Sequence, residues 1–195
     1  VSLTYKNEFI PYYEVETHEI DEDNIAVHAF VHPRRRLTRT ITFHGVKHVR
    51  PVLGLAMDQS FEFDFSCKKE YWNRYSRQAD LSFKGKYPQY AGRYGFLCHK
   101  DLSLFMKRVR KQILLRDLNP ENEKLHTYIV GEYGPVSFRP HFHILFFFDS
   151  DKLAKNFIRV VNSCWKFGRV DCSASRGQAE SYVAGYLNSF TSLPL

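Results

Sequence analysis

The sequence predicts an α+β fold in which an antiparallel sheet is backed by helices. Apolar residues recur at helical spacing over 99–116, whereas residues 61–65 alternate between apolar and acidic as a half-buried strand does. Two apolar runs, 127–132 and 139–148, flank a Gly-Pro turn signal and predict a hairpin. The predicted order is strand, long insertion, helix, strand, strand, helix, strand and helix. This order favours helices that gather on one face of the sheet.

Composition limits the class of protein. At 195 residues and 44% hydrophobic, the chain can bury one good core, and 1–195 is expected to be a single domain. It has no apolar run of transmembrane length and no signal-peptide pattern, so we expect a soluble cytoplasmic protein with no membrane partner. Because the chain starts at Val1 inside a strand-like stretch, we expect residues upstream of it to be missing. The four cysteines lack Cys-x-x-Cys spacing, which predicts reduced thiols and argues against a zinc ribbon or a disulfide framework.

The charge of the chain favours a polyanionic partner. The formal net charge is +7 and the pI is near 9.2. Lys and Arg side chains that neutralise phosphates gain affinity by releasing counterions. Arg34, Arg35 and Arg36 form the densest basic group, and we take them as candidate DNA contacts. Charge alone does not separate nucleic-acid-binding proteins from other basic proteins.

The first stretch, 1–5, is β-branched and aromatic and is followed by Pro11, which predicts a strand that ends in a turn. Residues 12–90 read as an elaboration on the core, with strand character at 25–31 and 37–43. Several histidines in this region have no sequence partner that suggests a site. We expect polar surface or DNA-facing roles for His18, His28, His32, His44 and His48.

Aromatic and basic residues are interleaved between 69 and 94. Tyr71, Trp72 and Tyr75 lie among Lys69 and Arg74, and the pattern continues toward residue 94. Aromatic faces stack on unpaired bases while cations follow phosphates, so the pattern is typical of a single-strand-binding surface. The same aromatics would also serve to pack a long loop region. The sequence leaves both interpretations open.

Residues 99–116 form the clearest helix. The apolar stripe that is predicted to face the core consists of Leu102, Phe105, Met106, Val109 and Ile113. Lys107 and Arg108 belong to the basic remainder of the helix surface, which is either a solvated face or a surface that steers DNA.

The predicted hairpin places metal-ligand chemistry beside an apolar run. Alternate side chains of a strand share a face, so His141 and His143 project together while Phe142 and Ile144 point into a core. Glu132 on the partner strand is in position to complete the site. Two imidazoles and a carboxylate suit Mg²⁺ or Mn²⁺, and Zn²⁺ fits as well. An isolated His-x-His pair is equally compatible with two partly exposed polar residues and no metal.

The last third of the chain predicts a helix, a short strand and a final helix. After Asp149 the apolar positions of the first helix are Leu153, Phe157, Ile158, Val161 and Trp165. Residues 168–172 form a short strand, and Ser175 with Gln178 resembles a capping box that starts a helix over 179–189. Tyr182 and Tyr186 lie four residues apart on that helix and therefore on one face. They form either a reactive pair or ordinary packing.

Three motifs together resemble a known family. Gly131-Glu132-Tyr133-Gly134 followed by Arg139-Pro140-His141-Phe142-His143 resembles the motif pair of the HUH endonucleases (His, hydrophobic, His). Tyr182-Val183-Ala184-Gly185-Tyr186 resembles the tyrosine motif of the replication initiators of small circular single-stranded DNA phages of the microvirus type. Leu3-Thr4-Tyr5 resembles the strand that opens the nuclease core of these proteins. The likeness covers 1–5 and 94–187.

The resemblance implies a βαββαβ core of the ferredoxin-like or RRM-like plan, with the long insertion after its first strand. It implies that His141, His143 and Glu132 hold Mg²⁺ or Mn²⁺, and that Tyr182 and Tyr186 are nucleophiles. The implied activity is site-specific nicking and joining of single-stranded DNA through a 5′-phosphotyrosine intermediate, which initiates rolling-circle replication of a phage or prophage. The implied partners are origin DNA, a host helicase and a polymerase, since no Gly-x-x-x-x-Gly-Lys-[Ser/Thr] motif is present.

One departure from the family pattern concerns charge near the tyrosines. The family commonly has Lys three residues after each Tyr, whereas Gly185 and Ser189 occupy these places. Arg176 is a candidate substitute for this cation, and Arg139 is a further candidate DNA contact. Three alternatives remain open: an HUH relaxase or transposase, a noncatalytic single-stranded nucleic-acid-binding module of the same topology, and a metal-dependent hydrolase of small phosphodiesters.

Overall fold

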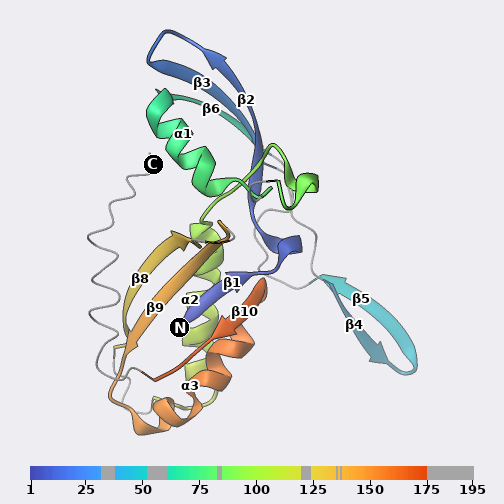
Figure 1. Ribbon diagram of the computed structural model, residues 1–195. Helices are drawn as coiled ribbons and strands as arrows, with labels where there is room; N and C mark the ends of the chain where they lie inside the picture. The colour runs from blue at the N-terminus through green and yellow to red at the C-terminus, as the bar shows by residue number, and fades with distance from the viewer. Residues whose placement is uncertain are drawn as a thin grey trace.

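The structure is a computed structural model that describes residues 1–31, 38–51, 61–82, 85–119, 124–134, 136 and 138–174 (Figure 1). The strands are β1 (Ser2–Tyr5), β2 (Tyr12–Glu19), β3 (Asn24–Val31), β4 (Thr38–Phe43), β5 (Val46–Pro51), β6 (Phe61–Lys68), β7 (Arg93–Gly95), β8 (His126–Tyr133), β9 (Pro140–Phe147) and β10 (Gly168–Asp171). The helices are η1 (Asn7–Phe9), α1 (Lys69–Ala79), η2 (Pro88–Tyr90), α2 (His99–Leu115) and α3 (Asp151–Cys164).

The first sheet is antiparallel and has the strand order β10-β1-β9-β8. Helix α2 precedes the hairpin β8–β9, and α3 connects that hairpin to β10, so the element order is βαββαβ with the other strands inserted between β1 and α2. This is the ferredoxin-like plan. The predicted α+β class and the long insertion after the first strand are confirmed.

Helices α2 and α3 cover one face of the first sheet, as Figure 1 shows. The strands turn Leu3, Tyr5, Phe142 and Ile144 toward the helices, and each of these side chains is at most 1% exposed. Their alternation with Ser2, Thr4, His141 and His143 is the period of two that a strand imposes. The opposite face of the first sheet, which we call the polar face, therefore carries the histidine pair.

Local chemistry fixes how α3 and β10 join this sheet. The Ser150 hydroxyl accepts a hydrogen bond from the Leu153 amide at 3.2 Å and caps the start of α3. After the helix, the Trp165 indole donates to the Thr4 carbonyl at 3.2 Å. Gly168 then approaches β1 so closely that an added Cβ atom would overlap the Thr4 oxygen. Only glycine allows this contact.

The second sheet is also antiparallel, with the strand order β6-β3-β2-β7. Helix α1 packs on its inner face, where Val27, Ala29 and Val31 of β3 meet Trp72 and Tyr75 of the helix in a separate buried cluster. Among the described strands, β4 and β5 pair only with each other and form a hairpin that projects from the rest of the molecule (Figure 1). The expectation of a single domain over 1–195 stays a prediction.

Two of the sequence-based expectations are wrong. The aromatic stretch 69–79 is a helix and not a loop, and Trp72 and Tyr75 are each only 8% exposed because they pack against the second sheet. The periodicity places Ile158 in the apolar stripe of α3, but this residue is 51% exposed. It follows Phe157 by one residue, which rotates it about 100° away from the buried stripe.

Several predictions fall outside the described residues. These concern the basic group Arg34, Arg35 and Arg36, His32, the capping box of Ser175 and Gln178, Arg176, and the final helix with Tyr182 and Tyr186. Within the part of the chain that the structure describes, no helix has both the length and the apolar character needed to span a membrane.

Candidate metal centre

Strand register brings the three predicted ligands together on the polar face of the first sheet. Glu132 of β8 lies directly opposite His141 of β9, and His143 lies opposite Val130, one diagonal step from Glu132. Residues that face each other across antiparallel strands have neighbouring side chains on the same side. The carboxylate and the two histidines therefore cluster in the structure, as their spacing in the sequence predicts.

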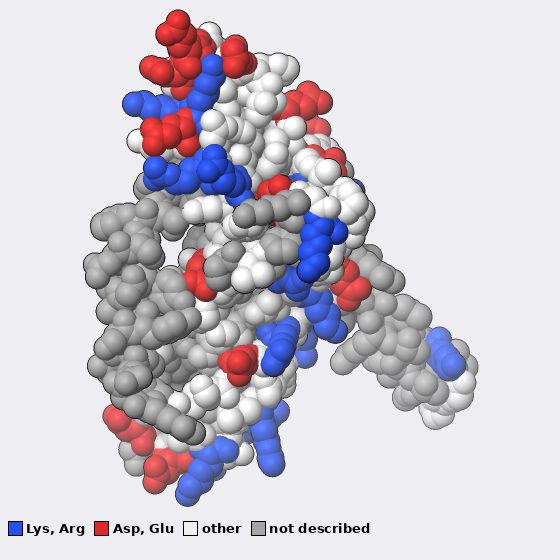
Figure 2. Space-filling model, in the orientation of Figure 1, with Lys and Arg blue, Asp and Glu red and all other residues white. Residues whose placement is uncertain are grey.

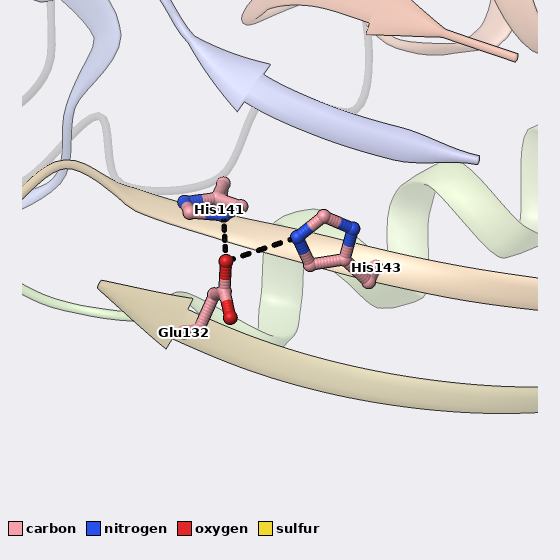
Figure 3. A group of neighbouring side chains, drawn as sticks. All are labelled: Glu132, His141 and His143. Atoms are coloured by element: carbon pink, nitrogen blue, oxygen red, sulfur yellow. Dashed lines mark hydrogen bonds and ion pairs between the residues drawn. The ribbon is translucent and has the colours of Figure 1, made fainter. Parts of the chain in front are cut away.

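The three side chains converge on one carboxylate oxygen (Figure 3). Glu132 Oε1 lies 2.5 Å from His141 Nε2 and 3.1 Å from His143 Nε2. The two imidazole rings stand edge to face, with centroids 4.9 Å apart. One possible ligand atom from each residue falls within 4.8 Å of the others. Such a set of two nitrogens and one oxygen can hold a divalent cation.

Each imidazole is oriented from behind by its other nitrogen. His141 Nδ1 lies 3.0 Å from the Arg139 carbonyl oxygen, and His143 Nδ1 lies 2.9 Å from the Ser2 hydroxyl. Metal-binding histidines usually have such a partner, which sets the tautomer and the ring orientation. Both Nε2 atoms are thereby directed at Glu132.

The chemistry of the donor set fits a cation. A carbonyl oxygen can only accept, so Nδ1 of His141 carries the proton of that hydrogen bond. Its Nε2 atom then meets the carboxylate of Glu132 with a lone pair unless a second proton or a cation lies between them. A metal ion that is bound by these atoms would take the place of that proton.

Burial adjusts the protonation of the pair. The side chains of His141, His143 and Glu132 are 14%, 16% and 20% exposed. Burial lowers the pKa of His143 below its ordinary value, and the hydrogen bond to Glu132 only partly opposes this effect. A neutral imidazole is the form that binds metal ions.

The predicted DNA contacts that the structure describes lie at different places relative to this centre. Arg139 precedes His141 closely, and its guanidinium donates to the Tyr5 carbonyl at 2.8 Å and to the Asn7 side chain. Lys107 and Arg108 belong to α2, which covers the other face of the sheet. Arg108 donates to the Cys164 carbonyl at 3.5 Å, and burial lowers its pKa.

Two residues of the polar face are not indicated by the sequence. Ser2 orients His143 from the neighbouring strand. Arg169 of β10 lies opposite Thr4, which in turn lies opposite His141, so one row of residues crosses all four strands and ends at Glu132. Arg169 is exposed. The strand pattern of 1–5 and 168–172 is visible in the sequence, but only the register links these residues to the site.

The insertion differs from expectation at His28. The sequence suggests no partner for this histidine, yet its Nδ1 lies 2.7 Å from Asp64 and its Nε2 lies 3.9 Å from Glu62. This group is exposed on the outer face of the second sheet, with side-chain exposures of 40% for His28 and 81% for Asp64.

Comparison with known proteins identifies the family. The chain is 33% identical over 98 residues to "Replication-associated protein VP4" of Bdellovibrio phage phiMH2K, in an alignment that covers 44% of this chain and 31% of the phage protein. The chain therefore matches less than a third of the length of that relative. No solved structure matches the chain. The family model of the replication-associated protein ORF2/gene II protein matches residues 89–191, which include α2, the hairpin β8–β9 with the histidine pair, α3 and β10. The chain belongs to this family of replication-associated proteins.

Proposed function

We propose that this chain is a metal-dependent endonuclease of the HUH type, which nicks and rejoins single-stranded DNA to initiate rolling-circle replication of a microvirus-type phage. The observation that carries the proposal is the convergence of Glu132, His141 and His143 at one point on the polar face of the first sheet. The family match supports a role in replication and in phage biology. We assign the whole of 1–195 to one nuclease domain in which the second sheet is an insertion.

The three clustered residues would hold Mg²⁺ or Mn²⁺. A divalent cation in such a site supplies charge neutralisation at the scissile phosphate. Glu132 contributes the negative charge, and the two imidazoles contribute directed lone pairs. The Arg139 carbonyl and the Ser2 hydroxyl keep these lone pairs aimed at one point, so little reorganisation is needed when the ligand binds.

The nucleophile in this proposal is Tyr182 or Tyr186. Its phenolic oxygen forms a bond to phosphorus while the bond from phosphorus to O3′ breaks, which leaves a 5′-phosphotyrosine and a free 3′-OH. The 3′-OH takes up a proton and is available to a polymerase, and a later attack by a 3′-OH on the phosphotyrosine rejoins the strand. With two tyrosines, one can hold the first end while the other cleaves after a round of synthesis.

Nearby tyrosines among the described residues are poorly suited to this role. Tyr133 follows Glu132 directly, but burial raises its pKa to about 12. Burial also raises the pKa of Tyr75 and Tyr13. A phenol must lose its proton to attack phosphorus, so these buried hydroxyls are weak nucleophiles. This supports a nucleophile from the C-terminal segment.

Arg169 supplies a cation on the same face as the ligands. Its row runs through Thr4 to His141, and adjacent strands lie about 4.8 Å apart, which places its backbone roughly 10 Å from that of His141. A phosphate next to the scissile one would be within reach of its long side chain. We propose Arg169 as a DNA-positioning residue, together with Arg139, Arg176 and the basic group at 34–36. A host helicase would separate the strands.

A covalent-adduct assay tests the proposal. The protein is incubated with a pool of end-labelled single-stranded oligonucleotides and Mn²⁺, and the products are separated on a denaturing gel. We expect a labelled protein band in the wild type that is reduced at least about 100-fold in His143→Ala, because both the ligand and the charge neutralisation are lost. Tyr182→Phe or Tyr186→Phe should remove it as well, and the variant that does so identifies the nucleophile.

His28→Ala is the matched control, because it removes an exposed histidine from a strand of the second sheet. It should form the adduct as the wild type does. Binding of DNA that is unaffected by EDTA and gives no adduct with Mg²⁺, Mn²⁺ or Zn²⁺ would contradict the nuclease and favour a noncatalytic single-strand-binding module.

A further inference from the structure

A hollow in the second sheet is unusually rich in aromatic side chains. It has a volume of about 390 Å³ and lies between α1 and the strands β2 and β6. The aromatic residues that line it are Tyr13, Phe63, Phe65, Trp72 and Tyr75. Ser66 and Cys67 add polar atoms to the wall. Ligand sites of this size, with mostly aromatic walls and a few polar groups, bind flat organic molecules.

The rings of this aromatic hollow are arranged as flat platforms. Phe63 and Phe65 stack with centroids 5.9 Å apart and planes 21° from parallel. Tyr13 and Tyr75 stack with centroids 6.1 Å apart and planes 22° from parallel. Phe63 is 39% exposed, although a ring of this size normally gains more by complete burial. A planar partner that stacks on the exposed part of this ring would complete its burial.

The hydroxyls in the hollow keep their hydrogen-bonding character. Those of Tyr13 and Tyr75 contact each other, and Tyr75 also donates to the Gly95 carbonyl at 3.3 Å. Burial raises the pKa of both phenols, so they keep their protons near neutral pH. A nucleobase combines a flat face with polar edges, and both features have a counterpart here.

The hollow is connected to the candidate metal centre. The Tyr75 ring packs edge to face on Tyr133, with centroids 6.4 Å apart. Tyr133 is the residue after Glu132 on β8. A strand whose phosphate lies at Glu132 and the histidines would therefore pass close to the hollow.

The charge of the second sheet restricts the side from which DNA can approach. Its outer face carries Glu16, Glu62 and Asp64 around His28. Figure 2 shows further acidic side chains gathered at the upper end of the molecule, where Asp21, Glu22 and Asp23 form the exposed turn between β2 and β3. Phosphates are repelled from these surfaces. The opposite face of β6, with its phenylalanines, is the side that a single strand can use.

We propose that the aromatic hollow binds one unpaired nucleobase of the DNA strand that is held at the metal centre. This inference rests on the proposed function, because it requires single-stranded DNA as the substrate. Stacking on Phe63 would supply affinity, and the tyrosine hydroxyls with Ser66 would contact the edge of the base. The insertion would thereby contribute to the choice of cleavage site, which the ligand set alone does not read.

The test compares binding of two probes in EDTA, where no cleavage occurs. One probe is single-stranded oligo-dT, and the other is an abasic deoxyribose-phosphate strand of the same length. Phe63→Leu keeps an apolar side chain but removes the flat ring, and Tyr71→Leu is the matched control because Tyr71 is 42% exposed on α1 and does not line the hollow. Fluorescence anisotropy gives the two dissociation constants for each variant.

We expect the wild type and Tyr71→Leu to prefer oligo-dT over the abasic strand by the same factor, and Phe63→Leu to reduce this preference roughly 5- to 100-fold. Oligo-dT should also quench the fluorescence of Trp72, whereas the abasic strand should not. Equal preference in Phe63→Leu and the wild type, or no quenching, would overturn the proposal and leave a segment of this chain as the occupant.

Failure of this inference is distinguishable from failure of the proposed function. Adduct formation by a protein whose base preference does not depend on Phe63 would reject the base site and keep the nuclease. Loss of base preference in Phe63→Leu, in a protein that never forms an adduct, would keep the base site and reject the nuclease. Absence of binding to either probe would reject both.

Discussion

Each four-stranded sheet contains a histidine that faces a carboxylate on the neighbouring strand, and the two pairs have different surroundings. In the first sheet, His141 faces Glu132, with side chains that are 14% and 20% exposed. In the second sheet, His28 faces Asp64, with side chains that are 40% and 81% exposed. The distances, 2.5 Å and 2.7 Å, are nearly the same.

The difference shows what separates a candidate metal centre from a surface ion pair. An exposed pair is screened by water and contributes little to stability. The pair in the first sheet is joined by a second imidazole, and the outer nitrogens of both rings have fixed partners. Burial, convergence of three ligands and oriented rings carry the assignment, whereas a short histidine-carboxylate contact alone does not.

Deforming the first sheet alone should have the largest effect on this comparison. Gly168→Ala would place a Cβ atom against the Thr4 carbonyl, so we expect the free energy of unfolding to fall by about 2–4 kcal/mol. Gly92→Ala is the control, because Gly92 has a φ of +75° but open space around it, and its cost should be only about 1 kcal/mol. Urea denaturation measures both values. Equal losses would show that the contact between β1 and β10 relaxes without strain.

Removing one outer partner of the metal centre should have an intermediate effect. Ser2→Ala deletes the hydroxyl that orients His143, and we expect the dissociation constant for Mn²⁺ to rise about 10-fold. Thr4→Val is the control, since Thr4 lies on the same strand and the same face. Isothermal titration calorimetry with Mn²⁺ compares the two variants. A value for Ser2→Ala that equals that of the wild type would remove Ser2 from the metal centre.

Changing the exposed pair of the second sheet should have the smallest effect. The hydrogen bond to Asp64 is the main reason that the pKa of His28 is raised, so Asp64→Asn should lower this pKa in an NMR titration. Because the folded-state pKa is raised, the pair stabilises the fold below the unfolded pKa of about 6.5, and this stabilisation is lost as the pH rises through the folded pKa. An unchanged pKa, or a loss of adduct formation, would contradict the view that this pair is only a surface contact.

The first sheet was predictable because its signals are local in sequence. The alternation in β9 put Phe142 and Ile144 into the core and the histidines on the other face, and the turn signal set the partner strand that carries Glu132. The roles of Ser2 and Arg169 depend on pairing between distant strands. Ser2 and His143 are 141 residues apart, and no local pattern specifies which strands become neighbours over such a distance.

The second sheet was harder to predict because its core uses ambiguous residues. In α1 the buried positions are Trp72, Tyr75 and Ala79, which have helical spacing but are few and mostly aromatic. The same residue types occur on single-strand-binding surfaces. Only the packing of α1 on β3 shows that Trp72 and Tyr75 are part of a core. The nucleophile positions Tyr182 and Tyr186 stay predictions, as they lie outside the residues that the structure describes.

The position of β1 in the middle of the first sheet determines the order in which the sheet can assemble during synthesis. This strand leaves the ribosome before the other described elements, but its neighbours β9 and β10 are among the last of them to be made. The strands β2, β3, β6 and β7 and the helix α1 emerge in between and can fold as a unit, because domains form from the N-terminal side as the chain grows. Closing the long loop from β1 to β9 has an entropic cost that only the complete core offsets. The candidate metal centre, which needs both strands, is therefore among the last of these features to form, and under the proposed function a nascent chain could not bind the metal or cut DNA before its core is finished.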